Sequence, residues 1–219
     1  YLRFGAGTTP IYLGIRINKN WYLNFSTSII NSSYFSFPGS ISQIRHGNAD
    51  LENNKPRTID LNNYGLNEIS YVQYSFGAIT KLFPDFEIGV HMSPIMGLSA
   101  VVTNKFLASI ETSDDFTTSL LKTDISMDVS GTLFETDKIS RVFRPRVAMN
   151  EFLLGKEAVS AKNSGMSVNI GFNYKAGDKW SFQGALNDLG SIKWRLEPQR
   201  LVSKGEYLFE GVQFSPYNL

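Results

Sequence analysis

The chain has no cysteine, and this absence excludes several classes of site. Without thiols there is no disulfide scaffold, no cysteine nucleophile and no zinc or iron–sulfur centre with cysteine ligands. Charge is also scarce: charged residues make up 19% of the chain, against roughly 25% in soluble domains. The formal net charge is +1, so no overall field favours nucleic acid or an acidic partner.

Long apolar runs are missing as well. No stretch of about 18 apolar residues occurs, so the sequence predicts no transmembrane helix. Aromatic residues, in contrast, are abundant, with 16 Phe, 10 Tyr and 3 Trp among 219 residues. This length suffices for a sizeable core, and no low-complexity linker divides it, so we expect a single β domain over residues 1–219.

Three segments share the pattern of a β-hairpin. In each, apolar and polar residues alternate over roughly 8–11 positions, a short turn follows, and a second alternating stretch begins. The three turns are Lys19-Asn20, Pro84-Asp85 and Ala176–Lys179. The alternating apolar residues around them are Ile11, Leu13, Ile15, Ile17, Trp21, Leu23 and Phe25; Val72, Tyr74, Phe76, Ala78, Leu82, Phe86, Ile88, Val90 and Met92; and Met166, Val168, Ile170, Phe172, Tyr174, Trp180, Phe182 and Leu186.

Two features distinguish these hairpins from those of a soluble sandwich. A large aromatic residue, Trp21, Phe86 or Trp180, opens each second strand, as in the aromatic girdle at a membrane–water interface. Long polar segments, residues 31–67 and 104–165, alternate with the tight turns, which is typical of outer-membrane barrels. We therefore predict an all-β, antiparallel up-and-down transmembrane β-barrel, whole or in part, with long outer loops.

The polar positions of the same strands would face the lumen of such a barrel. Closure into a barrel is the only way in which a β-sheet can sit in lipid, and the interior is then polar. In a soluble antiparallel sheet protein, which stays the alternative, these side chains would simply face solvent. The candidate lumen-facing residues are Arg16, Gln73, Glu87, His91, Asn169 and Gln183.

The long segments differ from one another. Residues 107–131 alternate weakly and predict a hairpin that projects beyond the membrane. Residues 134–162 are interpreted as an inserted loop, either folded into the lumen as a plug or lying outside as a lid. Ile41 and Ile44 form a short apolar patch that predicts one helical turn near the barrel mouth.

No pattern indicates catalysis. The two histidines, His46 and His91, share no motif, and Glu87 lies about 13 Å from His91 along a strand, too far for two ligands of one metal. No Gly-x-Ser-x-Gly nucleophile elbow is present. We expect no catalytic residue, no cofactor and no metal site, and hence no enzyme.

Clusters of charge leave two interpretations open. A basic cluster could meet lipopolysaccharide phosphates or an anionic solute, although a solvated loop is the simpler interpretation. An acidic set could hold a cation or remain solvated, and solvation is again simpler. The basic residues are Arg141, Arg144 and Arg146, and the acidic residues are Asp114, Asp115, Asp124 and Asp128.

The last third of the chain resembles a known family. The sequence NDLGSIKW at Asn187–Trp194, followed by YLFEGV at Tyr207–Val212, is similar to the closing signature of uncharacterised Bacteroidota outer-membrane β-barrel proteins. Upstream segments that are also similar are Gly47-Asn48, Tyr71–Tyr74 and Glu87–Val90. The resemblance covers most of residues 21–214 and extends, more distantly, to barrels that import long-chain fatty acids.

The departures from the family are Ser191, where a bulky apolar residue is usual, and the insertion at residues 134–162. Family members are usually longer, so we expect the chain to be an excerpt. We interpret Asp188 as a structural residue that caps backbone amides where a strand bends. The resemblance implies an outer-membrane location and no known reaction.

Three functions follow, in order of preference. The first is a passive transport barrel for a small or hydrophobic solute. The second is an accessory barrel subunit of a larger outer-membrane secretion or uptake complex, and the third, an outer-membrane enzyme, has the least support. The expected partners are membrane lipids and lipopolysaccharide, together with other subunits in the second case, but not nucleic acid.

Overall fold

The computed structural model describes residues 1–41, 55–56, 58–115, 117–131, 134–136, 143–145 and 162–210. These residues form antiparallel β-structure, so the predicted all-β fold class is confirmed. Within them, no helix is long and apolar enough to cross a membrane. The strands are β1 (Leu2–Arg16), β2 (Trp21–Ser36), β3 (Thr58–Asp60), β4 (Gly65–Phe83), β5 (Phe86–Thr112), β6 (Ser119–Gly131), β7 (Phe134–Thr136), β8 (Phe143–Pro145), β9 (Ser164–Ala176), β10 (Trp180–Lys193) and β11 (Gln199–Phe209).

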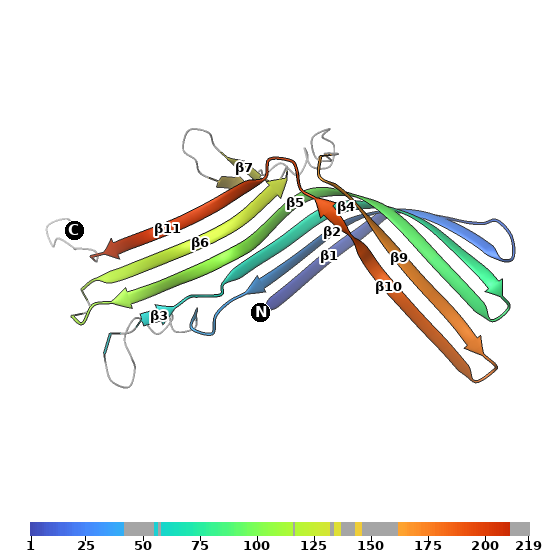
Figure 1. Cartoon of the computed structure of the whole chain (residues 1–219), viewed down its shortest axis with the longest axis horizontal. Helices are drawn as coiled ribbons and strands as arrows, with labels where there is room; N and C mark the ends of the chain where they lie inside the picture. Colours follow the sequence, from blue (N-terminus) through green and yellow to red (C-terminus); the bar gives the residue numbers. More distant parts are fainter. Residues whose placement is uncertain are drawn as a thin grey trace, which may run out of the picture.

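The main sheet is an up-and-down meander. Strands β1, β2, β4 and β5 are neighbours in that order, and the 27-residue β5 pairs on its other side with two strands in succession. Phe86–Met96 of β5 pairs with β9, and Ser99–Thr112 pairs with β6. Strand β10 pairs with the outer edge of β9, and β11 pairs with the outer edge of β6. The sheet therefore has six rows, and each of the last two rows consists of two strands placed end to end (Figure 1).

All three predicted hairpins are present, and their tight turns lie at the same end of the molecule, on the right in Figure 1. The sheet bends near its middle, and we name its two parts from these turns. The turn half comprises residues 11–29, 72–96 and 164–193, and the far half comprises residues 2–8, 30–36, 58–71, 98–131 and 199–209.

Irregular pairing lies at the level of the bend. On β1 the register shifts between Thr8 and Ile11, around Pro10, which lacks an N–H and is tolerated at an edge or a bulge. On β5 the extra residue Leu98 lies opposite the step from Ser70 to Tyr71. An extra residue in one strand bends it and increases its twist, so these bulges account for the change in direction.

The two end-to-end hairpins separate at a junction built around Asn163. This side chain is fully buried, and its Oδ1 accepts hydrogen bonds from the backbone N–H groups of Arg195 (2.7 Å) and Leu196 (2.8 Å). Its carbonyl oxygen accepts from Gly97 N–H at 2.7 Å. A Cβ on Gly97 would lie 2.6 Å from the Trp194 ring, so glycine lets the indole close over β5. The segment after β10 is thereby fixed to the middle of the sheet.

The long loops are shorter than predicted. Strand β2 extends to Ser36, β4 begins at Gly65, and β5 and β6 occupy most of residues 104–131, since ladder hydrogen bonds need only the backbone and tolerate polar side chains. The hairpin predicted over residues 107–131 is confirmed. Within the predicted insertion the structure describes the backbone ladder of β7 with β8, and the helical turn predicted at Ile41 and Ile44 extends outside the described residues.

The sheet is not closed. Over the described residues, the outer edge of β1 and the outer edges of β10 and β11 have no partner strand. Buried apolar side chains concentrate on the central strand β5, at Ile95, Leu98, Ala100, Val101 and Ala108. The core therefore lies at the bend and in the adjoining far half of this single sheet.

Candidate functional site

The turn half has one continuous apolar face. Pairing carries this face across all six rows of the sheet, because residues directly opposite one another in a ladder share a face. One such line of paired residues is Leu13, Phe25, Phe76, Met92, Val168 and Leu189. The next is Ile15, Leu23, Ala78, Val90, Ile170 and Leu186.

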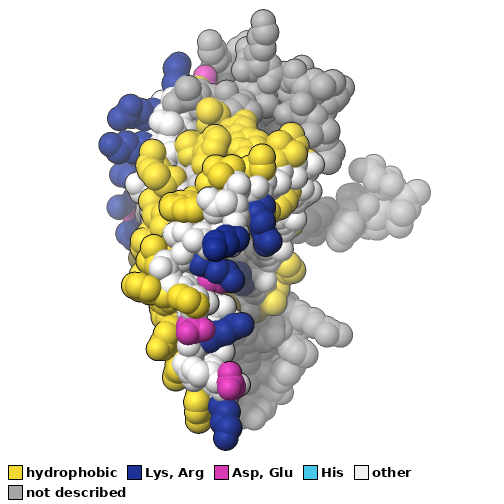
Figure 2. Space-filling view, turned by 90° about the vertical axis from the view of Figure 1, so that its right-hand side faces the viewer, with side chains coloured by type: hydrophobic (Ala, Val, Ile, Leu, Met, Phe, Trp, Pro, Cys, Tyr) yellow, Lys and Arg dark blue, Asp and Glu magenta, His cyan; other side chains and the backbone are white. Residues whose placement is uncertain are grey.

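Most of these apolar side chains are exposed. Leu13 is 62% exposed, Phe76 55% and Leu186 61%. These three residues come from three different hairpins, so the exposure extends across the whole face. Figure 2, which looks toward the end with the tight turns, shows hydrophobic side chains across the upper part and down the left border. Charged side chains run down the middle, and further Lys and Arg side chains lie at the upper left. Soluble monomers rarely expose apolar patches larger than a few hundred Å². A face of this kind requires a cover of lipid or protein.

The predicted girdle residues lie on this apolar face beside the turns. Trp180 is 69% exposed and Trp21 46%. The Phe86 ring packs between two aromatic rings of β9, at centroid distances of 6.2 Å from Phe172 and 6.3 Å from Tyr174. The fold thus brings the three aromatics to one end of the sheet, and their place at a membrane interface stays a prediction.

The opposite face of the turn half is polar. Here Gly14, Asn24, Gly77, His91 and Asn169 form one line of paired residues. The imidazole Nε2 of His91 lies 3.4 Å from Asn24 Nδ2, and both side chains cover Gly77. A Cβ on Gly77 would come within 2.3 Å of the His91 ring, so this contact requires glycine.

All six residues predicted to face a lumen lie on this polar face. Arg16 is paired with Tyr22 on β2, and Gln73 is paired with Ile95 on β5. The same pairing, followed from strand to strand, also places Gln183 of β10 on this face. Whether the face borders a lumen is not decided by the register, and that assignment stays a prediction.

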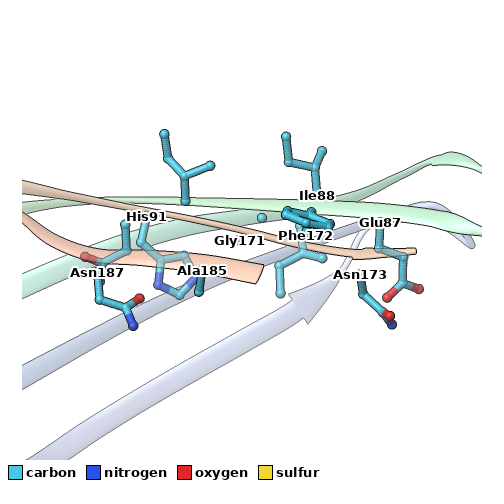
Figure 3. Close-up of a pocket in the computed structure, with 12 residues that line it drawn as sticks. Glu87, Ile88, His91, Gly171, Phe172, Asn173, Ala185 and Asn187 are labelled. Carbon is cyan, nitrogen blue, oxygen red and sulfur yellow. The ribbon is translucent and has the colours of Figure 1, made fainter. Parts of the chain in front are cut away.

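The sequence reasoning missed a depression in the polar face, which we call the glycine hollow. Its floor is the cross-strand pair Gly89–Gly171, next to Ala185. It has a volume of about 300 Å³. Figure 3 shows Glu87, His91, Asn173, Asn187 and Ala185 projecting on one side of the ribbons and Ile88 on the other. The other residues that line it are Ile79, Asn169, Ile170 and Phe172. The feature that could have predicted the hollow is a pair of glycines facing each other at polar positions of neighbouring strands. This pair can be recognised only once the register between the strands is known.

Charge in the glycine hollow is balanced. The Glu87 carboxylate is its one acidic group, and Lys81 Nζ lies 3.1 Å away. Two of the three asparagines are oriented by hydrogen bonds: Asn169 Oδ1 accepts from the backbone N–H of Asp188, and Asn173 Oδ1 accepts from Ser181 Oγ at 3.3 Å. The bulge at Asp188 is therefore capped by Asn169, whereas the sequence suggested that Asp188 itself would be the cap.

The structure assembles no metal centre from the residues it describes. No group of three His, Asp or Glu side chains there is placed to hold an ion. Glu87 and His91 share the polar face of β5, four positions apart, as expected from alternation. His46 lies outside the described residues.

One protein-family model matches the chain, over residues 1–218, and its description is "Family of unknown function (DUF5723)". The chain belongs to DUF5723. Neither the curated proteins nor the solved structures contain a significant match. In this DUF5723 member the match includes every strand of the meander, so both faces of the turn half belong to the family's domain.

The far half of the DUF5723 sheet carries cross-strand ion pairs. Lys105 Nζ lies 2.6 Å from Asp124 Oδ2, and Lys122 Nζ lies 2.7 Å from Glu111 Oε2. Asp124, a candidate cation ligand in the sequence, is thus a β6 residue whose carboxylate is engaged by lysine. Within the predicted basic cluster, Arg141 and Arg146 lie outside the described residues, and of Arg144 only the backbone is described.

Asp115 and Asp128, two more of the predicted acidic residues, also have protein partners. Asp115 closes the turn between β5 and β6: its Oδ1 accepts from Ser113 Oγ at 2.6 Å and from Thr117 N–H at 3.1 Å. Asp128 forms a bidentate pair with Arg200, at 2.7 Å and 3.0 Å. These two carboxylates are thus engaged by groups of the protein, Asp115 within a turn and Asp128 between two strands.

The pair between Arg200 and Asp128 predicts a pH effect. The Arg200 hydrogen bonds, followed by one from Asn104, lower the pKa of Asp128 from 3.8 to about 2. Because the folded-state pKa is the lower one, the stabilisation is complete above about pH 4 and is lost as the pH falls through 2. Arg200→Gln should raise this pKa toward 3.8, as followed by the carboxyl carbon NMR shift of Asp128. Lys204→Gln is the control, since Lys204 faces Asp124 at 3.9 Å, and an equal shift there would contradict the assignment.

Proposed function

We propose that this DUF5723 chain forms all or part of the wall of a bacterial outer-membrane β-barrel, and that the barrel passes a small solute. The observation that carries the proposal is the segregation of the turn half into one exposed apolar face and one polar face across six rows. A sheet in lipid needs this arrangement, with the apolar side toward acyl chains and the polar side toward a wet interior.

The dimensions of the turn half support the proposal. The segment of β5 that pairs with β9 runs from Phe86 to Met96. At about 3.3 Å per residue and a tilt of about 45°, it rises about 25 Å, the height of the apolar band of an outer-membrane barrel. The far half, with its ion pairs, would then project from the membrane on the side opposite the tight turns.

The relief of the apolar face is also compatible with lipid. A shallow depression of about 650 Å³ lies where Ala78 is surrounded by larger side chains, among them Leu23, Phe76 and Val90. An acyl chain could fill such a depression without any polar contact. The soluble alternative would need a protein partner to cover the whole face.

The free edges favour a second candidate function. Unpaired backbone N–H and C=O groups cost several kcal/mol each in lipid, so the edges of β1, β10 and β11 must be paired there. Single-chain barrels of bacteria have at least about eight strands, and the sheet here has six rows. Pairing with strands of another protein would make this chain an accessory barrel subunit of a larger secretion or uptake complex.

The first test is location. We expect the protein to fractionate with outer membranes and to migrate faster on gels before heating than after it, because a closed barrel resists unfolding by detergent. An outer-membrane porin and a periplasmic protein from the same cells are the controls. Recovery in the soluble fraction would rule out the barrel.

Conductance separates the two candidates. A transport barrel reconstituted alone into a planar bilayer should give stable, stepwise currents in potassium chloride. An accessory subunit should insert without such steps until its partner strands are added. The measurement therefore distinguishes the functions after location has been established.

A further inference from the structure

We infer that the glycine hollow binds a neutral, hydroxyl-rich solute of the size of a mono- or disaccharide. The inference rests on the proposed function and deepens it, because it names the class of solute. It contrasts with the hydrophobic solute considered from the sequence. Three features of the hollow support it: the reason for its glycine floor, the chemistry of its walls and its charge.

At Gly171, in the floor of the hollow, a side chain would fit without a clash, yet the position is glycine and the floor is open. A Cβ on Gly171 would meet its nearest atoms, Gly184 O and Ala185 Cβ, at 3.5 Å and 3.7 Å, which is ordinary contact. No left-handed backbone conformation requires glycine at this position either. At Gly77, in contrast, the His91 ring fills the space above the backbone. Gly171 therefore leaves an empty volume. At the opposite Gly89, the Ile79 side chain lies 3.3 Å from the position of an added Cβ and forms an apolar wall of the hollow.

The walls offer groups that match hydroxyls. Each carboxamide of Asn169, Asn173 and Asn187 has two N–H donors and one acceptor oxygen, and a hydroxyl likewise both donates and accepts. The hydrogen bonds to Asn169 Oδ1 and Asn173 Oδ1 fix the orientation of these two amides. Their N–H donors are consequently held in place for a ligand.

The charge of the hollow selects against ions. Its one carboxylate, Glu87, is paired with Lys81, so an anion meets no free cation and a cation must compete with the lysine. An apolar solute would remove water from the carboxamides without replacing their hydrogen bonds, which is costly. The volume of about 300 Å³ is at the lower end of the range for ligand pockets. A neutral polyol carries no charge, can replace the hydrogen bonds of water to the carboxamides, and is small enough for this volume.

Binding of maltose to the full chain refolded in detergent micelles tests the inference. Saturation-transfer NMR should detect maltose, and the anionic polyol gluconate should bind more weakly. Gly171→Leu, which fills the hollow at an uncrowded position, should weaken maltose binding by at least about tenfold. Asn173→Leu removes a hydrogen-bonding wall and should weaken it about fivefold.

Gly205→Leu is the matched control, since Gly205 lies in β11 of the far half with no atom within 4 Å of an added Cβ. It should bind maltose as the unaltered chain does. Absence of maltose binding, equal binding of gluconate, or unchanged binding in Gly171→Leu would overturn the inference. None of these results touches the barrel proposal, which is decided by fractionation, so the two failures are distinguishable.

Discussion

Val90→Arg should lower the free energy of unfolding in lipid vesicles by about 2–4 kcal/mol, the cost of arginine near the midplane on the lipid face of an outer-membrane barrel. Val90 lies in the middle of the apolar face, between Ala78 on β4 and Ile170 on β9, and is 38% exposed. Urea-induced unfolding of both proteins in the same vesicles measures the difference.

The neighbouring position provides the control. His91 points to the opposite, polar face and borders the glycine hollow, where water can hydrate a charge. His91→Arg should therefore cost far less than Val90→Arg. An equal or larger cost at position 91 would mean that the strand is buried on both faces or faces the other way, and the membrane argument would lose its main support.

The second large effect is expected at the junction. Asn163→Leu keeps the approximate volume of the side chain but deprives the Arg195 and Leu196 N–H groups of their acceptor. Two donors left without a partner cost about 1–3 kcal/mol each, less where water reaches them, so we expect a loss of about 2–4 kcal/mol. The same urea titration measures it.

Asn173→Leu is the comparison for this variant. Asn173 also accepts a hydrogen bond through Oδ1, but it is half-buried on β9 and the bond to Ser181 is exposed to solvent. Water can therefore replace the asparagine as the partner of the Ser181 hydroxyl. Its effect on stability should be below about 0.5 kcal/mol. Similar losses for the two variants would show that the junction does not depend on Asn163.

The sequence alone determined which side chains share a face of each hairpin. Successive residues of a strand point to opposite faces, and this rule is local, so Ile88, Val90 and Met92 could be assigned without knowledge of their neighbours. The turn at Pro84-Asp85 was equally readable, because its residue types favour reversal of the chain. The six predicted lumen residues followed from the same alternation and lie on one face, although the lumen itself is still a proposal.

Only the tertiary structure decided how far the strands run. The sequence predicted a long polar loop from residue 104 onward, yet β5 continues to Thr112. Ladder hydrogen bonds use only backbone groups, so polar side chains do not end a strand that has partners on both sides. Polarity was a poor guide to loops in the far half, where Asp128 and Arg200 pair across 72 positions of sequence.

The glycine hollow and the Asn163 junction likewise depended on register. Gly89 and Gly171 are separated by two hairpins in the chain, and nothing in their local sequence states that they face each other. Register between distant strands is set by which pairing satisfies the backbone and buries the most surface over the entire sheet. That is a property of all six rows together, so it could not be derived from the period-two pattern of any one of them.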